Sequence, residues 1–251
     1  MSTKSRIFPA KLLLMQRKVF LRKLRKVISV KPYDSEYLCL ETGNAKLGRE
    51  GKFYKSMFVW NLPSVATCPG ASNWCLENCY NADDRTLVFP VERWAKNWWL
   101  YLNEPYKLRD RITEQLHSAA KPCAVRIHSS GDFFSNDYVN FWGNIIDLNK
   151  DVKFWAYTRS WIINDIRLSL ENLRSFNNIE LFASWDSTMR LPPPINWRKS
   201  YVFYNENGAE CFCRENPNTL ICLEQIDAVA NCASCGICTK DLKKDIAFYF
   251  H

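Results

Sequence analysis

Short apolar runs alternate with amphipathic stretches along most of the chain. Residues 84–119, 137–149 and 163–174 carry apolar side chains three and four positions apart, which predicts helices, and Pro105 divides the first stretch into two. The other runs predict strands: GKFYKSMFVWNLP (51–63), AVRI (124–127), KFWAYTRSW (153–161), IELFASWDS (179–187) and the run from Ser200. Helices between strands are typical of βα units around a parallel sheet. The pattern predicts an α/β fold, as a partial or full (β/α) barrel.

The predicted strands turn polar where they end. The polar ends are His128 to Asp132, Tyr157 to Arg159, and Ser184 to Asp186. Ligands of parallel α/β proteins bind at this end of the strands. His128, Asp132 and Arg159 are therefore candidate catalytic residues, as an imidazole, a carboxylate and a guanidinium that binds anions. Structural roles remain open too: a hydrogen bond at the sheet rim for His128, a helix cap for Asp132 and a surface ion pair for Arg159.

The number of cysteines bears on the cellular compartment in which the protein is expected. The chain has 11 cysteines in 251 residues, an odd number, and no signal-peptide pattern precedes them. Disulfide frameworks belong mostly to short secreted chains, so these cysteines predict a reduced, cytoplasmic, metal-binding protein. No apolar run approaches the ~20 residues of a membrane span.

The C-terminal cysteines predict a metal site. Cys232, Cys235 and Cys238 form two overlapping C-x2-C steps, Gly236 allows the tight turn, and Cys222 is the expected fourth ligand. This spacing favours a 4Fe-4S cluster, while four thiolates also suit zinc. For Cys211 and Cys213 three roles stay open: joining the site, replacing Cys222, or being buried.

Three further cysteines follow the first predicted strand. Cys68, Cys75 and Cys79 lie in TCPGASNWCLENCYN (67–81), where Pro69 and Gly70 favour an irregular loop. One interpretation is a 4Fe-4S cluster with three protein ligands and one iron left open to a reactant. The alternative is zinc completed by a distant group, such as His128 or a spare tail cysteine.

Positive charge is concentrated at the N-terminus. Of the 34 Lys and Arg residues, ten lie in residues 1–31, which contain no acid, so the formal charge of +8 belongs to this arm. The arm predicts an amphipathic helix that packs on the body, contacts nucleic-acid phosphates, or acts as a targeting or membrane-surface segment. We divide the chain into a basic arm (1–35), an α/β domain (36–208) and a cysteine-rich tail (209–251).

Several motifs resemble one family in the same order. They are ETGNAKLG (41–48), LPSVATCPGASNWCLENCY (62–80), VRIHSSGDFFS (125–135), FWAYTRSW (154–161), LFASWD (181–186) and CLEQ with the final C-x2-C-x2-C. Together, over about residues 41–240, they resemble the bacteriophage gene product 88 family. That family implies a phage origin and no settled activity.

The order of motifs is also similar to that of radical S-adenosylmethionine (SAM) enzymes, although C-x6-C-x3-C departs from their C-x3-C-x2-C spacing. This resemblance implies that Ser130, Gly131 and Asp132 hold the amino group of SAM. It also implies that Ser184 and Asp186 bind the ribose or the substrate. An electron donor would be a partner, and the tail cluster would relay electrons or anchor the substrate.

The sequence thus predicts an iron–sulfur protein, radical-SAM-like, with nucleic acid or nucleotides as the suggested substrate. Two alternatives have zinc in place of iron–sulfur clusters. One is a zinc-stabilised nucleic-acid-binding protein with the basic arm on phosphates. The other is a zinc-dependent hydrolase or base-exchange enzyme that uses His128 and Asp132 to modify nucleic acid.

Overall fold

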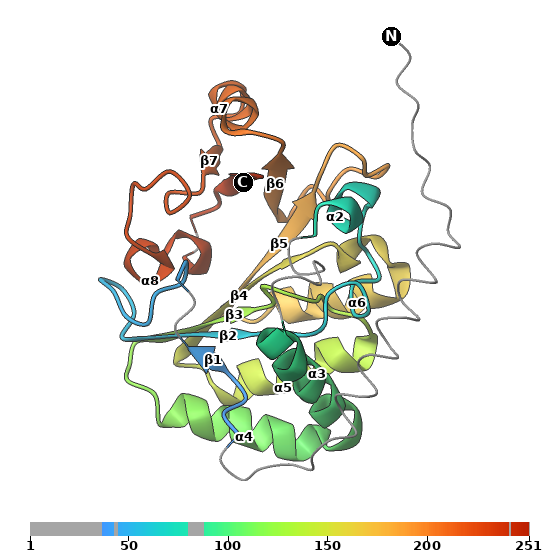
Figure 1. Cartoon of the computed structure of the whole chain (residues 1–251), viewed down its shortest axis with the longest axis vertical. Helices are drawn as coiled ribbons and strands as arrows, with labels where there is room; N and C mark the ends of the chain where they lie inside the picture. Colours follow the sequence, from blue (N-terminus) through green and yellow to red (C-terminus); the bar gives the residue numbers. More distant parts are fainter. Residues whose placement is uncertain (1–36, 43–44, 80–87, 241, 251) are drawn as a thin grey trace.

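The computed structural model describes residues 37–42, 45–79, 88–240 and 242–250. The helix predicted in the basic arm lies outside them. The described chain builds one eight-stranded sheet in the order β1-β2-β3-β4-β5-β6-β8-β7 (Figure 1). The strands are β1 (Glu41–Thr42), β2 (Ser56–Trp60), β3 (Cys123–Ile127), β4 (Val152–Thr158), β5 (Ile179–Trp185), β6 (Arg198–Phe203), β7 (Thr219–Ile221) and β8 (Asp245–Tyr249).

The sheet is mostly parallel and open. Strands β2 to β6 follow one another in sequence order, all neighbours from β2 to β7 are parallel, and only β1 pairs antiparallel. Strands β1 and β7 are edges of two and three residues, so the sheet does not close into the full barrel that was one of the two predicted forms. Closure needs strands that tilt and pair continuously around a ring, which these short edges do not provide.

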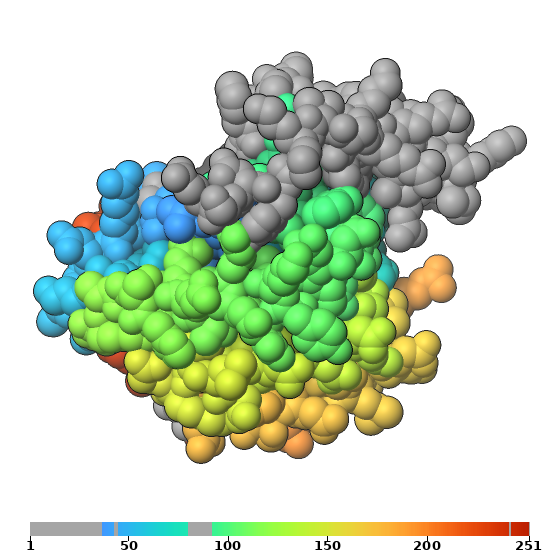
Figure 2. All heavy atoms as spheres, turned by 90° about the horizontal axis from the view of Figure 1, so that it is seen from below, coloured from blue at the N-terminus to red at the C-terminus, as the bar shows by residue number. Residues whose placement is uncertain are grey.

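The predicted helices form between the strands. They are α3 (Val88–Asn103), α4 (Pro105–His117), α5 (Asn136–Leu148) and α6 (Asn164–Arg174). Pro105 begins α4, where a missing backbone N–H costs nothing, and the Ser135 hydroxyl caps α5 by accepting from the Tyr138 N–H at 3.2 Å. Figure 2 shows the outer surface of this layer, green for α3 and α4 and yellow for α5 and α6.

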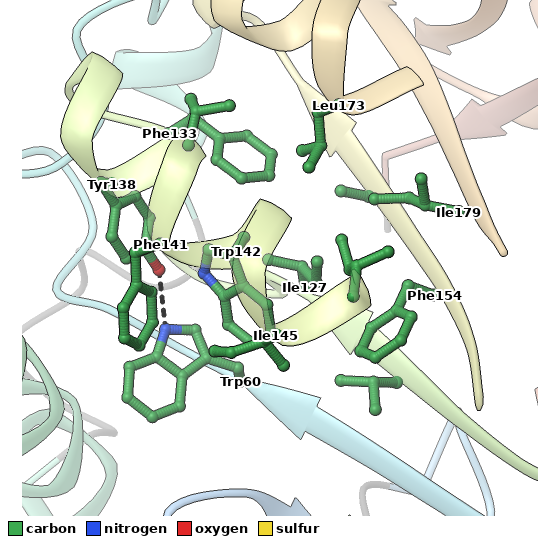
Figure 3. Packing of buried hydrophobic residues seen from close by; sticks show 14 of the residues in the cluster. Trp60, Ile127, Phe133, Tyr138, Phe141, Trp142, Ile145, Phe154, Leu173 and Ile179 are labelled. Atoms are coloured by element: carbon green, nitrogen blue, oxygen red, sulfur yellow. Dashed lines mark hydrogen bonds between the residues drawn. The ribbon is translucent and has the colours of Figure 1, made fainter. Parts of the chain in front are cut away.

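The main core lies between these helices and one face of the sheet. Trp60 of β2 packs edge-on against Trp142 of α5, with ring centroids 5.9 Å apart, and its indole N–H donates to the Tyr138 hydroxyl at 2.8 Å (Figure 3). Ile127 and Phe154 of the neighbouring strands are fully buried in the same cluster. A large aromatic core of this kind supplies most of the free energy that favours folding.

The cysteine-rich tail covers the opposite face of the sheet. Helix α8 (Cys232–Cys235) lies on the side away from α4 and α5 (Figure 1), and Ala233 is buried against Met57 and Trp155. Backbone hydrogen bonds join α8 to residues 46–53, including one of 3.0 Å from the Ala233 N–H to the Leu47 carbonyl. Because β7 and β8 also belong to residues 209–251, the predicted tail is built into the sheet rather than appended to it.

Candidate functional site

The first cysteine group lies at the C-terminal edge of the parallel strands. Helix α2 (Asn73–Glu77) carries Cys75, so the segment predicted as an irregular loop contains one short helix. Ser72 explains this difference, because its hydroxyl caps the helix by accepting from the Cys75 N–H at 3.1 Å.

The charges of neighbouring loop cysteines affect the pKa of Cys68 and that of Cys75. Burial raises the pKa of the Cys68 thiol well above its usual value, and the nearby charges of Asp132, Cys75 and Cys79 raise it further. Burial also raises the pKa of Cys75, where Arg159 acts in the opposite direction. The charge of Asp132, which follows β3, thus acts on both Cys68 and Cys75, and the charge of Arg159, which follows β4, acts on Cys75.

Both carboxylate oxygens of Asp132 accept hydrogen bonds from within the protein. One carboxylate oxygen accepts from the Thr158 hydroxyl at 2.6 Å and the Phe133 N–H at 2.7 Å, and the other accepts from the Arg159 N–H at 2.9 Å. Burial raises the pKa of Asp132, and these hydrogen bonds act against the rise. The side chain expected to receive the SAM amino group therefore connects the ends of β3 and β4.

Asp186 holds the cysteine loop against the sheet. It is 1% exposed, and one oxygen accepts from the Ser72 hydroxyl and, at 3.2 Å, from the Arg159 guanidinium. Its other oxygen accepts from the Thr188 hydroxyl at 2.6 Å. Burial acts to raise the pKa of Asp186, but these hydrogen bonds and the Arg159 charge bring it below its usual value. Asp186 thus positions the cap of the helix that carries Cys75.

The remaining residues of the predicted cofactor set also have internal roles. Gly131 has a φ of +83°, which favours glycine. A Cβ at this position would lie only 2.7 Å from the Leu62 Cβ, so glycine allows this turn to approach the segment that leads into the cysteine loop. The Ser130 N–H donates to Asn61 at 2.9 Å, and the Ser184 hydroxyl shares a 2.9 Å hydrogen bond with Ser200. Sequence reasoning missed Asn61 and Ser72, because their roles depend on contacts with distant segments.

His128 lies in the core and not beside the cysteine loop. Its backbone φ of +70° accompanies a side chain that packs edge-on against Phe133, and its Nε2 lies 2.8 Å from the Tyr138 hydroxyl. Burial lowers the pKa of His128 to about 3, so the imidazole is neutral at pH 7. In this position His128 is a structural group of the core.

This buried imidazole predicts a specific acid sensitivity. Because the unfolded chain binds a proton near pH 6.5 and the folded chain does not, the free energy of unfolding should fall by about 2 kcal/mol between pH 7 and pH 5. Urea unfolding at both pH values should show this loss in the native protein and a smaller one in His128→Gln. His117→Gln, on the exposed end of α4, is the control. Equal losses in all three proteins would contradict the prediction.

The four predicted tail ligands meet at one cavity. Cys222, Cys232, Cys235 and Cys238 all line it, together with Met57 and Trp155 of the sheet. Burial, together with the nearby charge of Cys222, raises the pKa of Cys232 to about 12 and that of Cys238 to about 11. Gly236 ends α8 in the left-handed conformation, with φ of +66°, which turns the chain toward Cys238.

The other two tail cysteines lie elsewhere. Cys211 and Cys213 belong to α7 (Glu206–Glu215), outside the residues that line this cavity, and the Cys211 sulfur accepts from Arg214 at 3.0 Å. Within the described residues, no group of three or more His, Cys, Asp or Glu side chains is arranged to hold a single metal ion. In the same part of the chain, no helix is long and apolar enough to cross a membrane.

These features define an α/β protein with an open, mostly parallel sheet and two groups of cysteines. Residues 38–241 match the family described as Gene product 88, so the chain belongs to this family. It is 28% identical over 190 residues to the gene 88 protein of Mycobacterium phage L5, covering 68% of this chain and 77% of that protein. It is 34% identical over 103 residues to the gene 88 protein of Mycobacterium phage D29, covering 37% and 42% respectively. No solved structure matches the chain.

Proposed function

We propose that this protein binds two iron–sulfur clusters and carries out one-electron chemistry at the first. Cys68, Cys75 and Cys79 would hold a 4Fe-4S cluster at the C-terminal edge of the sheet. The observation that supports the proposal best is the cavity lined by four tail cysteines, and the loop thiols, whose charges act on one another, follow β2 at the edge where parallel α/β proteins bind their ligands. The tail thiols would hold the second cluster.

The donor sets fit such clusters. Thiolates are the ligands that iron–sulfur clusters take, and the tail cysteines line one cavity at the close spacing that places thiolates on adjacent irons. Burial raises the pKa of Cys68 and Cys75 in the first group and of Cys232, Cys235 and Cys238 in the second, and a bound metal would offset this by supplying positive charge. When bound, an iron–sulfur cluster accepts and releases single electrons.

The protein's own residues would orient the first cluster. Asp186 accepts from Ser72, Ser72 caps the helix of Cys75, and the positive charge of Arg159 acts on the Cys75 thiol. A guanidinium at this position favours the anionic thiolate and would offset the negative charge of an added electron. Arg159 is 17% exposed, so part of its side chain also remains accessible to an anionic substrate.

SAM chemistry does not follow from this arrangement. The Asp132 carboxylate accepts three hydrogen bonds, Ser184 is paired with Ser200, and Asp186 is paired with Ser72 and Arg159. Since these side chains were expected to bind SAM, its binding remains a prediction from motif order, and no step is assigned to it. Nucleic-acid contact likewise rests on the basic arm, which lies outside the described residues.

Metal analysis tests the proposal directly. Protein purified without oxygen should be brown, absorb near ~400 nm and contain about eight irons with matching sulfide, because two 4Fe-4S clusters carry four each. Iron supplied during expression should raise the yield of brown protein. A colourless protein that contains zinc after the same procedure would overturn the proposal in favour of a zinc-stabilised protein.

A further inference from the structure

A tyrosine of the central sheet contacts the tail cysteine group. The hydroxyl of Tyr157, on β4, donates to the Cys238 sulfur at 2.8 Å. Its ring lies against Phe182 and Phe248, with centroid distances of 4.9 and 5.4 Å. The guanidinium of Arg126 lies 5.4 Å from the ring centroid. These contacts hold the phenol in one orientation on the face that the tail covers.

The same strand also supports the first cysteine group. Thr158 and Arg159 follow Tyr157 directly, and both donate to Asp132, which interacts with Cys68. Consecutive residues of a strand point to opposite faces of the sheet. At the end of β4, Tyr157 therefore contacts the tail cysteine group, while Thr158 contacts Asp132. The Tyr157 side chain and two peptide units thus connect Cys238 to the Asp132 carboxylate, whose charge acts on Cys68.

We propose that Tyr157 is a positioning residue of the tail cluster, whose hydrogen bond to the Cys238 sulfur raises the reduction potential of that cluster. The inference rests on the proposed function. A cluster gains negative charge on reduction, and part of this charge resides on the cysteine sulfurs. A hydrogen bond to sulfur therefore stabilises the reduced form more than the oxidised form.

The substitution Tyr157→Phe removes this hydroxyl and keeps the ring. In redox titrations of the full-length protein followed by electron paramagnetic resonance, the midpoint potential of one cluster should shift to a more negative value, while the other is unchanged. Tyr54→Phe is the matched control: its hydroxyl donates to the Thr239 hydroxyl at 2.6 Å, one residue from Cys238, without touching a sulfur. Its two potentials should equal those of the native protein.

A second measurement needs no variant. Electron–nuclear double resonance of the reduced native protein should detect a proton beside the tail cluster that exchanges in deuterated water. Unchanged potentials in Tyr157→Phe, equal shifts in both variants, or the absence of this exchangeable proton would overturn the inference. These outcomes differ from failure of the proposed function, which would appear earlier as a native protein without iron.

Discussion

Replacing Cys68, Cys75 and Cys79 together by alanine is expected to lower the iron content from about eight to about four per chain, because one of two 4Fe-4S clusters is lost. The fold should remain, since none of these three residues belongs to the main core or to the smaller hydrophobic cluster around Met57 and Trp155 on the opposite face of the sheet. Iron and sulfide analysis, with circular dichroism as the measure of folding, checks both expectations.

The corresponding tail variant should behave differently. Cys232 and Cys238 pack against the hydrophobic cluster that contains Met57, Trp155 and Ala233, and α8 is hydrogen-bonded to residues 46–53. Replacing Cys232, Cys235 and Cys238 by alanine should therefore remove iron and also lower the unfolding temperature. The double variant of Cys211 and Cys213, which lie on α7, is the matched control and should keep its iron. A loop variant that unfolds, or loses all its iron, would show that the first site is structural.

Asp186→Ala is expected to lower the free energy of unfolding by about 3 kcal/mol. The carboxylate is 1% exposed, and its loss leaves the Arg159 guanidinium and the Ser72 hydroxyl without this partner. Removing one member of a buried pair typically costs about 3–5 kcal/mol, and we expect the lower value because Arg159 is 17% exposed. Urea unfolding under anaerobic conditions measures the change.

The same variant should lose iron selectively from the loop site. Without Asp186, Ser72 no longer holds the start of α2 against the sheet, so Cys75 loses its fixed position, whereas the tail cavity is unaffected. Asp151→Ala is the control: this carboxylate is 61% exposed and pairs with Lys121 at 2.8 Å, so its loss should cost less than ~1 kcal/mol and no iron. Equal effects of the two substitutions would contradict the role assigned to Asp186.

The elements of the fold were predictable because their signals are local. The spacing of apolar residues predicts α5 and α6 to within one residue at each end, and Pro105 divides α3 from α4. Helix α2 was missed although a signal was present, since Ser72 is a typical N-cap residue before Asn73. Pro69 and Gly70 precede this cap, so they do not prevent the helix that begins at Asn73.

The strand pattern predicts where several candidate residues lie in the fold but not which contacts they make. Asp132, Arg159 and Asp186 lie where parallel strands end, and the structure places them near the cysteine loop as the strand pattern indicates. Their hydrogen bonds depend on which turns face one another across the sheet, which no local pattern encodes. His128 shows the same limit: its positive φ accompanies a side chain that lies in the core, although the residue follows directly on β3.

By itself, the sequence determined the order of strands and helices, the two cysteine groups and the family, because periodicity, caps and motif spacing are properties of neighbouring residues. The tertiary structure alone decided that the sheet stays open, that the tail joins it, and that Asp132 and Asp186 serve as internal connectors. It also decided that Tyr157 reaches Cys238, 81 positions away. Such contacts follow from strand register and from the packing of distant segments, which become defined only when the chain folds.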